Sequence, residues 1–467
     1  MSSSSSPMPH VLLVSAPLQG HVNPLLVLGR HLASRGLLVT FSTAPHAGLK
    51  FGHGDGATVD VGRGTIRFEH LKGGALWASD DPRYHDPTGG LMRHLEEAAP
   101  PVLAGLIRRQ SGAGRPVSCV VANAFAPWAT RVAGGMGVPH AMLWTESCAV
   151  LSLFYHYFHS LADFPSRDAG PGATVAVPGL PPLAAGDLPA LIHAPDEFVW
   201  RQVLIADLRS LRETVTWVLV NTFDELELPT MEALRPHLPV IPVGPLCSEA
   251  ESHGSGHDDD GDCVAWLDAQ PPRSVVFVAF GSLLQISRDE MSELAEGLAA
   301  TGRPFLLVVR DDNRELLPDA GDDCLAAATG SGSRGKVVAW CDQARVLSHA
   351  AVGCFVTHCG WNSTVEALAS GVPVVTYPAW ADQPTNAKFL ADVYGVGVRL
   401  PKPMARDALR RCIEEVMGGG PEAVAVRARS GKWKAEASAA LSTGGSLDKG
   451  IQDFVAAILS TCAGTVE

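Results

Sequence analysis

The stretch HVLLVSAPLQGHVNPLLVLGRHLASRGLLVTFST, residues 10–43, decides the fold class. It opens with an apolar run rich in Val and Leu. After the loop PLQGH, residues 23–36 show the apolar spacing of an amphipathic helix that ends at Gly36. The run LLVTFST, residues 37–43, predicts the next strand. A strand, a helix and a strand within about thirty-five residues form the β–α–β unit of a parallel sheet. The sequence therefore predicts an α/β protein.

The same alternation recurs along the chain in two blocks. The first block continues with the predicted strands CVVANA, HAMLWT and WVLVNT, and the second contains RSVVFVAFGS, PFLLVVR, KVVAW, VGCFVTH and VPVVTY. A chain of 467 residues also exceeds what one hydrophobic core usually supports. We therefore predict two doubly wound domains, residues 1–247 and 263–440. A flexible acidic linker at 248–262 joins them, and a helix within 441–467 is expected to dock near the domain interface.

Charge and cysteine content exclude several classes of protein. The formal net charge is −13, and the stretch 248–262 alone carries six acidic residues and no basic one. The remainder offers no basic stripe for nucleic acid or for an anionic membrane. The ten cysteines form no CxxC pair and no zinc-ligand spacing, which predicts reduced thiols and no metal. The N-terminal MSSSSSPMPH lacks the apolar core of an export signal, so we expect a cytoplasmic protein.

A second informative stretch is THCGWNSTVEALASGVP, residues 357–373, where a strand ends, a glycine follows and a helix begins. Free N–H groups and the positive end of the dipole make a helix start suitable for a phosphate. The alternative is a capping box, since Ser363 and Glu366 have the spacing of that motif and would need no ligand. His358 and Trp340, at the ends of two strands, favour a nucleotide diphosphate because they add an imidazole and an aromatic plane.

A third stretch, VVANAFAPW at residues 120–128, ends a buried strand at a neutral amide, Asn123. In an open parallel sheet the carboxyl ends of the strands face the ligand crevice. Asn123 is therefore either the start of a loop or part of a site.

The stretch from Trp340 to Gln383 closely resembles the signature box of plant UDP-dependent glycosyltransferases. The resemblance extends to QGHVNP, to VNTFDELE, to WLDAQPPRSVVFVAFGS and to the C-terminal helix, so it covers nearly the whole chain. The opening of the sequence is most similar to the branch that makes glucose esters of phenolic and cinnamic acids. This resemblance implies the glycosyltransferase B fold, in which two Rossmann-like domains face each other across a cleft. It places a UDP-sugar on the C-terminal domain and a small aromatic acceptor on the N-terminal one.

The resemblance also implies site residues. The positions matching the donor site are Trp340 on uracil with Cys341 next to it, Gln343 and Glu366 on the ribose, His358, Gly360, Asn362, Ser363 and Ser282 on the diphosphate, and Trp361, Asp382, Gln383 and Thr145 on the sugar. The final Gln of the box is the residue associated with glucose. Asp342 departs from the usual Pro, which should change loop stiffness more than chemistry. No metal is required if N–H donors and His358 neutralise the departing UDP.

His21, in the loop after the first strand, matches the family's base for the acceptor. The family pairs this histidine with an Asp at the position of Asn123. An amide there weakens the base, whereas a carboxylic acid is already ionised at neutral pH and needs none. We therefore predict an inverting glucosyltransferase that forms 1-O-glucose esters, and an Asn123→Asp variant with a relatively better phenol acceptor. Candidates for the acceptor pocket, each of which could instead be a core residue, are Phe125, Trp144, Phe154 and Trp200.

Three alternatives stay open. The first is a phenol or flavonoid O- or C-glucosyltransferase. The second is a non-catalytic sugar-nucleotide-binding protein, which the altered partner of His21 suggests. The third is a nicotinamide oxidoreductase, which the lack of a G-x-G-x-x-G motif after the first strand disfavours. No feature of the sequence indicates an oligomeric state.

Overall fold

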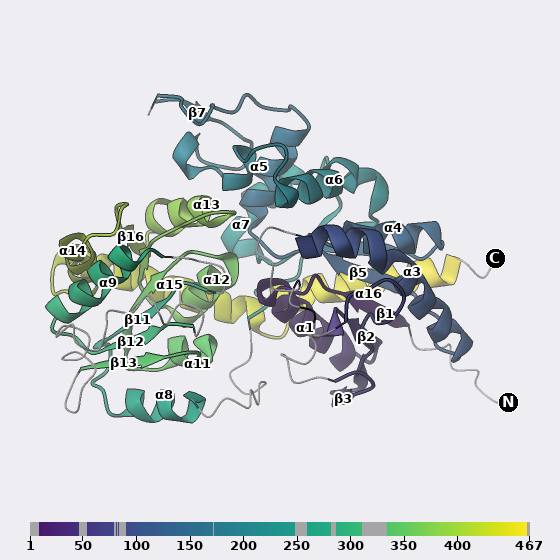
Figure 1. The fold of residues 1–467 in the computed structure, drawn as a ribbon, viewed down its shortest axis with the longest axis horizontal. Coiled ribbons are helices and arrows are strands. Elements are labelled where there is room, and N and C mark those ends of the chain that lie inside the picture. Colours follow the sequence, from purple (N-terminus) through teal and green to yellow (C-terminus); the bar gives the residue numbers. More distant parts are fainter. Residues whose placement is uncertain are drawn as a thin grey trace. The chain divides into compact units, whose positions relative to one another are not determined.

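A computed structural model describes residues 9–45, 54–78, 81, 83, 90–170, 172–247, 259–281, 286–310 and 334–464 (Figure 1). The chain forms two compact units. The first comprises Met1–Ala185, Leu191–Ser248 and Ala440–Glu467, and the second comprises Gly186–Ala190 and Glu249–Ala439. Each unit contains a sheet of parallel strands with helices between them, so the predicted α/β class with two wound sheets is confirmed.

The sheet of the first unit has the order β10-β9-β6-β5-β1-β2-β4-β3, and its neighbouring strands are parallel except β3 and β4. Its strands are β1 (His10–Val14), β2 (Leu38–Ser42), β3 (Thr58–Val61), β4 (Gly64–Phe68), β5 (Cys119–Asn123), β6 (His140–Trp144), β9 (Trp217–Val220) and β10 (Val240–Pro242). β1 and β5 are buried at every position, as the continuous apolar runs predicted, because both faces of a parallel sheet are covered.

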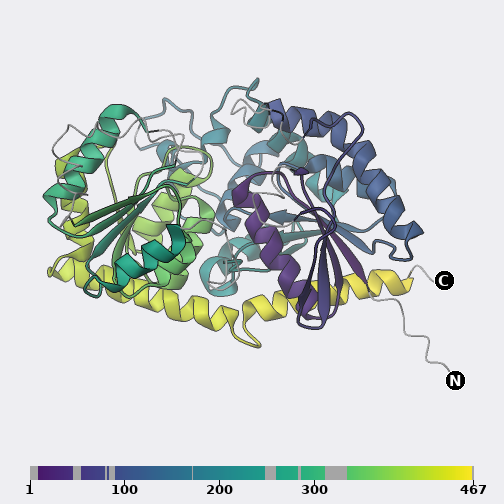
Figure 2. The same ribbon diagram turned by 60° about the horizontal axis from the view of Figure 1, so that its bottom comes forward.

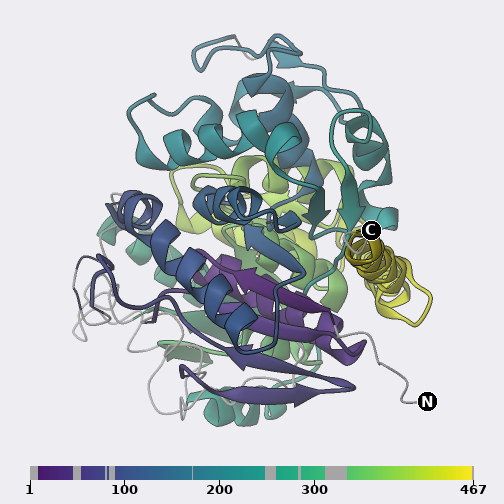
Figure 3. The same cartoon turned by 90° about the vertical axis from the view of Figure 1, so that its right-hand side faces the viewer.

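The first unit's helices are α1 (Gln19–Ser34), α3 (Gly90–Gly112), α4 (Pro127–Gly135), α5 (Cys148–Phe158), α6 (Val199–Thr214), α7 (Asp224–Leu234) and α16 (Ser446–Gly464). α3, α4 and α6 pack on one another, as Figure 3 shows. A short antiparallel pair, β7 (Thr174–Val175) and β8 (Leu183–Ala184), and the 3-10 turns η2 (Ala185–Asp187) and η3 (Ala190–Ile192) precede α6.

The C-terminal helix α16 belongs to the first unit although the chain reaches it last (Figure 2). Ile451 and Phe454 are fully buried in the same hydrophobic core as α1 and β1. A β-carbon on Gly450 would lie 1.7 Å from the carbonyl oxygen of Pro242 in β10, so only glycine permits this close approach. The helix predicted within 441–467 therefore forms part of the first unit's core.

The sheet of the second unit has the order β13-β12-β11-β14-β15-β16, with every neighbouring pair parallel. Its strands are β11 (Val275–Ala279), β12 (Phe305–Val308), β13 (Gly335–Val338), β14 (Val352–Thr357), β15 (Val374–Thr376) and β16 (Gly397–Arg399). Its helices are α8 (Asp259–Asp268), α9 (Arg288–Ala300), α11 (Gln343–Ser348), α12 (Trp361–Ser370), α13 (Gln383–Lys388), the π-helical η5 (Phe389–Val393), α14 (Arg406–Met417) and α15 (Pro421–Leu441). Residues 259–262 of the predicted linker are the start of α8, and its residues 248–258 lie outside the described residues.

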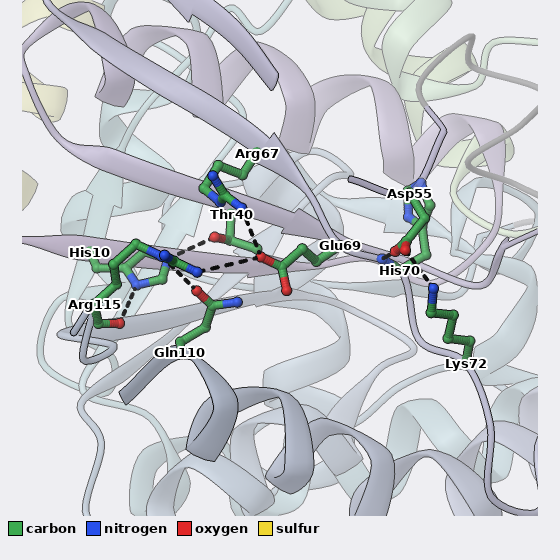
Figure 4. A network of polar contacts seen from close by, with 9 residues as sticks. All are labelled: His10, Thr40, Asp55, Arg67, Glu69, His70, Lys72, Gln110 and Arg115. Carbon is green, nitrogen blue, oxygen red and sulfur yellow. Dashed lines mark hydrogen bonds and ion pairs between the residues drawn. The ribbon is translucent and has the colours of Figure 1, made fainter. Parts of the chain in front are cut away.

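A network of polar contacts lies at the amino end of β1 (Figure 4). The Nδ1 atom of His10 lies 2.9 Å from the carbonyl oxygen of Arg115, and its Nε2 lies 2.8 Å from Oγ1 of Thr40. Because a carbonyl only accepts, Nδ1 carries the proton and the Thr40 hydroxyl donates to Nε2. Burial lowers the pKa of His10, which keeps the ring neutral. The amino end of the strand is thus tied together by structural contacts, whereas the predicted site residues follow the carboxyl ends.

Candidate active site

Asn123 is the last residue of β5 and is almost fully buried. Its side-chain oxygen accepts a hydrogen bond from the N–H of Ala16 (2.9 Å), and its Nδ2 donates to Oγ of Ser15 (2.9 Å) and to the carbonyl oxygen of His21 (3.0 Å). The amide therefore holds the chain between β1 and α1. The Asn123 amide binds the main chain of His21 and not its imidazole. The expectation that Asn123 replaces an Asp paired with the imidazole is therefore corrected.

His21 lies in the first turn of α1 and not in the preceding loop, because the helix begins at Gln19. Its Nδ1 lies 3.0 Å from Oγ1 of Thr145, which follows β6. Its ring packs edge-on against Phe125, with centroids 5.5 Å apart. Burial lowers the pKa of His21 to about 4, so the imidazole is neutral at physiological pH. Thr145 is thus the side chain that orients His21, a contact that the sequence did not predict.

The aromatic candidates for an acceptor pocket separate into two pairs. Phe125 and Trp200 pack edge-on at 5.5 Å, and Phe125 also touches His21. Phe125 has a positive φ of 67°, which is unusual for a bulky residue and typical of functional loops. Trp144 and Phe154 instead pack on each other at 6.2 Å with 0% and 1% exposure. All four residues are buried, but only Phe125 contacts the histidine, and Trp200 packs on Phe125.

One buried carboxylate of the first unit was not identified from the sequence. Glu227, in α7, accepts hydrogen bonds from the N–H groups of Cys148 (2.9 Å) and Ala149 (2.8 Å) at the start of α5. A carboxylate at a helix N-terminus is favoured by the free N–H groups and the dipole. Glu227 therefore fixes the beginning of α5, which follows Thr145 closely in the chain. Glu227 is the last residue of the motif VNTFDELE. The sequence did not reveal its role because Cys148 and Ala149, which it binds, lie 79 and 78 residues earlier in the chain.

In the second unit, α12 begins directly after β14 with Gly360 as its N-cap, and no side chain caps it. The alternative of a capping box is therefore wrong, since Ser363 lies inside the first turn. The preceding loop contains Cys359, which has a positive φ of 68°. The carbonyl of Cys359 accepts a hydrogen bond of 2.9 Å from Nδ2 of Asn386. The main chain of Trp361 hydrogen-bonds to the carboxylate of Asp382, and the positive end of the α12 dipole favours an anion at this helix start.

His358 stands beside this helix start between two glycines. A β-carbon on Gly281 would come within 2.6 Å of its Nε2, and one on Gly360 within 2.7 Å. Its Nδ1 is buried without a hydrogen-bond partner among the described residues. Burial lowers the pKa of His358 to about 4. The neutral ring is thus packed closely against backbone at the place where the sequence predicted a diphosphate contact.

Gln343 and Glu366, predicted to hold one ribose, are joined to each other. Nε2 of Gln343 donates to Glu366 (2.7 Å) and to Oγ of Ser363 (2.9 Å). Burial raises the pKa of Glu366 to about 7, and the neighbouring Asp342 also raises it. Asp342 is the N-cap of α11 and accepts from the N–H of Arg345 at 3.0 Å. The departure from Pro therefore supplies a helix cap next to Gln343.

Asp382 and Gln383 are both nearly buried at the start of α13. The carboxylate of Asp382 accepts from Nδ2 of Asn386 at 2.6 Å, and burial raises its pKa to about 6. The side-chain oxygen of Gln383 accepts from the N–H groups of Ala379 (2.8 Å) and Trp380 (3.2 Å). The pair therefore belongs to one tightly bonded turn. Of the other predicted donor residues, Trp340 and Asn362 are half-buried, Cys341 and Trp361 are buried, and Ser282 lies outside the described residues.

Comparisons with known proteins identify the family. Residues 197–422 match the family described as UDP-glucoronosyl and UDP-glucosyl transferase. The chain is 40% identical over 97% of its length to a gallate 1-beta-glucosyltransferase from Quercus robur, of which it covers 90%. The chain belongs to the UDP-dependent glycosyltransferases. It is also 39% identical to a cinnamate beta-D-glucosyltransferase from Fragaria ananassa, over 97% of this chain and 83% of that one.

A solved structure supports the same assignment of the glycosyltransferase. Os79 from O. sativa in complex with UDP has a TM-score of 0.82 and 31% identity, covering 96% of this chain and 100% of that one. The glycosyltransferase B fold predicted from the motifs is confirmed by this likeness. Within the described part of the glycosyltransferase, no group of three metal-ligating side chains is placed to hold an ion, and no helix is long and apolar enough to cross a membrane.

The lowered pKa of His21 predicts a pH-dependent difference in stability. An unfolded chain protonates this histidine near pH 6.5, but the folded glycosyltransferase does so only near pH 4. Acidification between these values therefore favours unfolding through His21. We expect a His21→Gln variant to become more stable relative to the wild type as pH falls from 7 to 4.5. Urea unfolding of both proteins at each pH measures the difference between their free energies of unfolding. The carboxyl groups that both proteins share contribute equally to both and cancel in this difference. A difference that is constant with pH would contradict the assignment.

Proposed function

We propose that this glycosyltransferase transfers glucose from UDP-glucose to an aromatic carboxylic acid and forms a 1-O-β-glucose ester. A carboxylate oxygen attacks C1 of the sugar from the side opposite UDP, the bond from C1 to the UDP oxygen breaks, and UDP leaves with the electron pair. The configuration at C1 is thereby inverted. The relatives named for gallate and cinnamate glucosylation support this acceptor class.

The donor half of the proposal rests on the second unit. The first-turn N–H groups of α12 and the His358 ring would stabilise the charge that develops on UDP, without a metal. Trp340 is proposed to stack on uracil, and Gln343 and Glu366 to bind the ribose. Asp382 and Gln383 are proposed to contact the hydroxyl groups of glucose.

The acceptor half rests on one observation: the neutral His21 is oriented by a hydroxyl, Thr145, while the neighbouring Asn123 carries no charge. With its pKa lowered to about 4, His21 is a poor base for a phenol, whose pKa is about 10. A carboxylic acid with a pKa of about 4 arrives already ionised and needs no base. His21 would then position the acceptor, and Phe125 beside it, with Trp200 packed on Phe125, would contact the aromatic ring.

The test compares benzoate and phenol as acceptors with UDP-glucose and the purified protein. We expect kcat/KM for the acid to exceed that for the phenol by at least about tenfold, because only the phenol needs a proton removed. The acid product should be cleaved by hydroxylamine, as esters are, and its anomeric proton should show the coupling of a β-linkage. A product that survives hydroxylamine, or a preference for phenol, would favour the phenol or C-glucosyltransferase alternative. UDP-glucose binding without UDP release for any acceptor would favour a non-catalytic binder.

A further inference from the structure

The segment Gly186–Ala190 groups with the second unit although the chain before and after it belongs to the first. Hydrogen bonds of Asp187 and Ala190 attach it to the second unit. The Asp187 carboxylate accepts from Nη1 of Arg399 at 2.9 Å, and its carbonyl accepts from Oγ1 of Thr385 at 2.7 Å. The N–H of Ala190 donates to the carbonyl of Ala381 at 2.7 Å.

The Ala190 bond reaches the turn Ala381–Gln383 itself, and the two Asp187 bonds reach the helix that follows the turn and the strand β16. Ala381 has a positive φ of 55°, a strained conformation for a non-glycine residue that persists only where its surroundings enforce it. Gln383 restrains the turn from within, through the N–H groups of Ala379 and Trp380. The bond from Ala190 restrains it from outside, and the bond to Thr385 anchors the helix turn that follows. The conformation of the turn thus depends on a segment about two hundred residues away in the chain.

Asp187 is suited to hold this attachment. Its side chain is 11% exposed, whereas that of Arg399 is 41% exposed and also lies 3.6 Å from Asp392. A hydrogen bond between two charged groups is stronger than one to a neutral group, so removing the charge of Asp187 weakens this attachment. Breaking the pair should therefore move the segment, while Arg399 can turn to Asp392 or to solvent.

We propose that Asp187 is a positioning residue that fixes the Ala381–Gln383 turn and thereby sets which sugar the enzyme accepts. This inference rests on the proposed contact of Asp382 and Gln383 with the glucose hydroxyls. Hexoses differ in the orientation of single hydroxyl groups, and a site that hydrogen-bonds a hydroxyl discriminates strongly only while its polar groups are held in place. A looser turn should bind the UDP portion as before but distinguish the sugars less well.

The experiment uses two variants of the full-length protein. Asp187→Asn keeps the size of the side chain and the main-chain bonds but removes the charge opposite Arg399. Thr385→Val keeps the shape of a buried residue but removes the hydroxyl that donates to Asp187. Isothermal calorimetry measures the Kd of UDP, UDP-glucose and UDP-galactose for each. Glu414→Gln, which breaks the exposed ion pair with Arg303 on the same unit, is the matched control.

For both variants we expect the Kd of UDP to stay within about twofold and that of UDP-glucose to rise about tenfold, with a smaller ratio between the two sugars. Thr385→Val keeps the test valid if Asp187→Asn does not fold. UDP binding that weakens in parallel with UDP-glucose binding, or unchanged discrimination, would overturn the proposal. A lack of turnover in the wild type would contradict the proposed function. It would not affect this test, because nucleotide binding is measured without an acceptor.

Discussion

Replacing His358 by alanine is expected to lower kcat/KM for UDP-glucose by about 10- to 1000-fold, the range found when one donor to a developing oxyanion is removed. The ring lies beside the start of α12 and is held between Gly281 and Gly360. Its Nδ1 is buried without a partner among the described residues, so it has a position for a further hydrogen bond. Because the ring is neutral, it can donate one N–H to the diphosphate and accept at the other nitrogen.

A second variant tests whether activity requires the His358 ring to be in this position, because it moves the ring without removing it. Gly360 has a negative φ of −59°, so Gly360→Ala introduces no backbone strain, yet its β-carbon would lie 2.7 Å from Nε2 of His358. The ring must move, and we expect a loss of activity approaching that of His358→Ala. Gly419→Ala, where a β-carbon would meet nothing within 4 Å, is the matched control. Steady-state kinetics with UDP-glucose and UDP calorimetry measure the effect. An unchanged kcat/KM in His358→Ala would contradict the assignment.

Asn123→Asp is expected to lower the free energy of unfolding by about 3 kcal/mol at pH 7, because a buried carboxylate would lack a compensating charge. The new oxygen would face the carbonyl oxygen of His21, to which the amide now donates at 3.0 Å. Burial raises the pKa of such a carboxyl above its unfolded value, so stability is retained at low pH and lost as pH rises through the folded pKa. The deficit should therefore shrink toward pH 5.

Urea unfolding at pH 7.5 and pH 5 measures this deficit. Asn123→Ala is the control, because it removes the same hydrogen bonds without adding a charge and its deficit should not depend on pH. An Asn123→Asp variant that is as stable as the wild type at both pH values would show that the new side chain turns elsewhere. Since the carboxylate would not reach the imidazole of His21, we no longer expect this substitution to improve phenol acceptors.

Local sequence patterns determined the strands and the helix starts of this protein. Continuous apolar runs predicted β1 and β5, because strands of a parallel sheet are covered on both faces. The Gly-containing turn after β14 predicted a helix N-terminus at the right place, because a strand end, a glycine and a helix are neighbours in the chain. Motif spacing also placed His358 and Gly360 together for the same reason.

The tertiary structure alone decided what those side chains contact. The pattern Ser-x-x-Glu occurs at Ser287–Glu290 and at Ser363–Glu366, and only the first is a capping box. At the second, the loop after β14 starts the helix at Trp361, and Gln343, twenty-three residues away from Glu366, binds the carboxylate. Likewise, Asn123 binds the main chain of His21 and Asp187 binds Arg399 across long stretches of sequence. A hydrogen bond depends on which groups the packed sheets and helices bring within about 3 Å, and no local pattern encodes that distance.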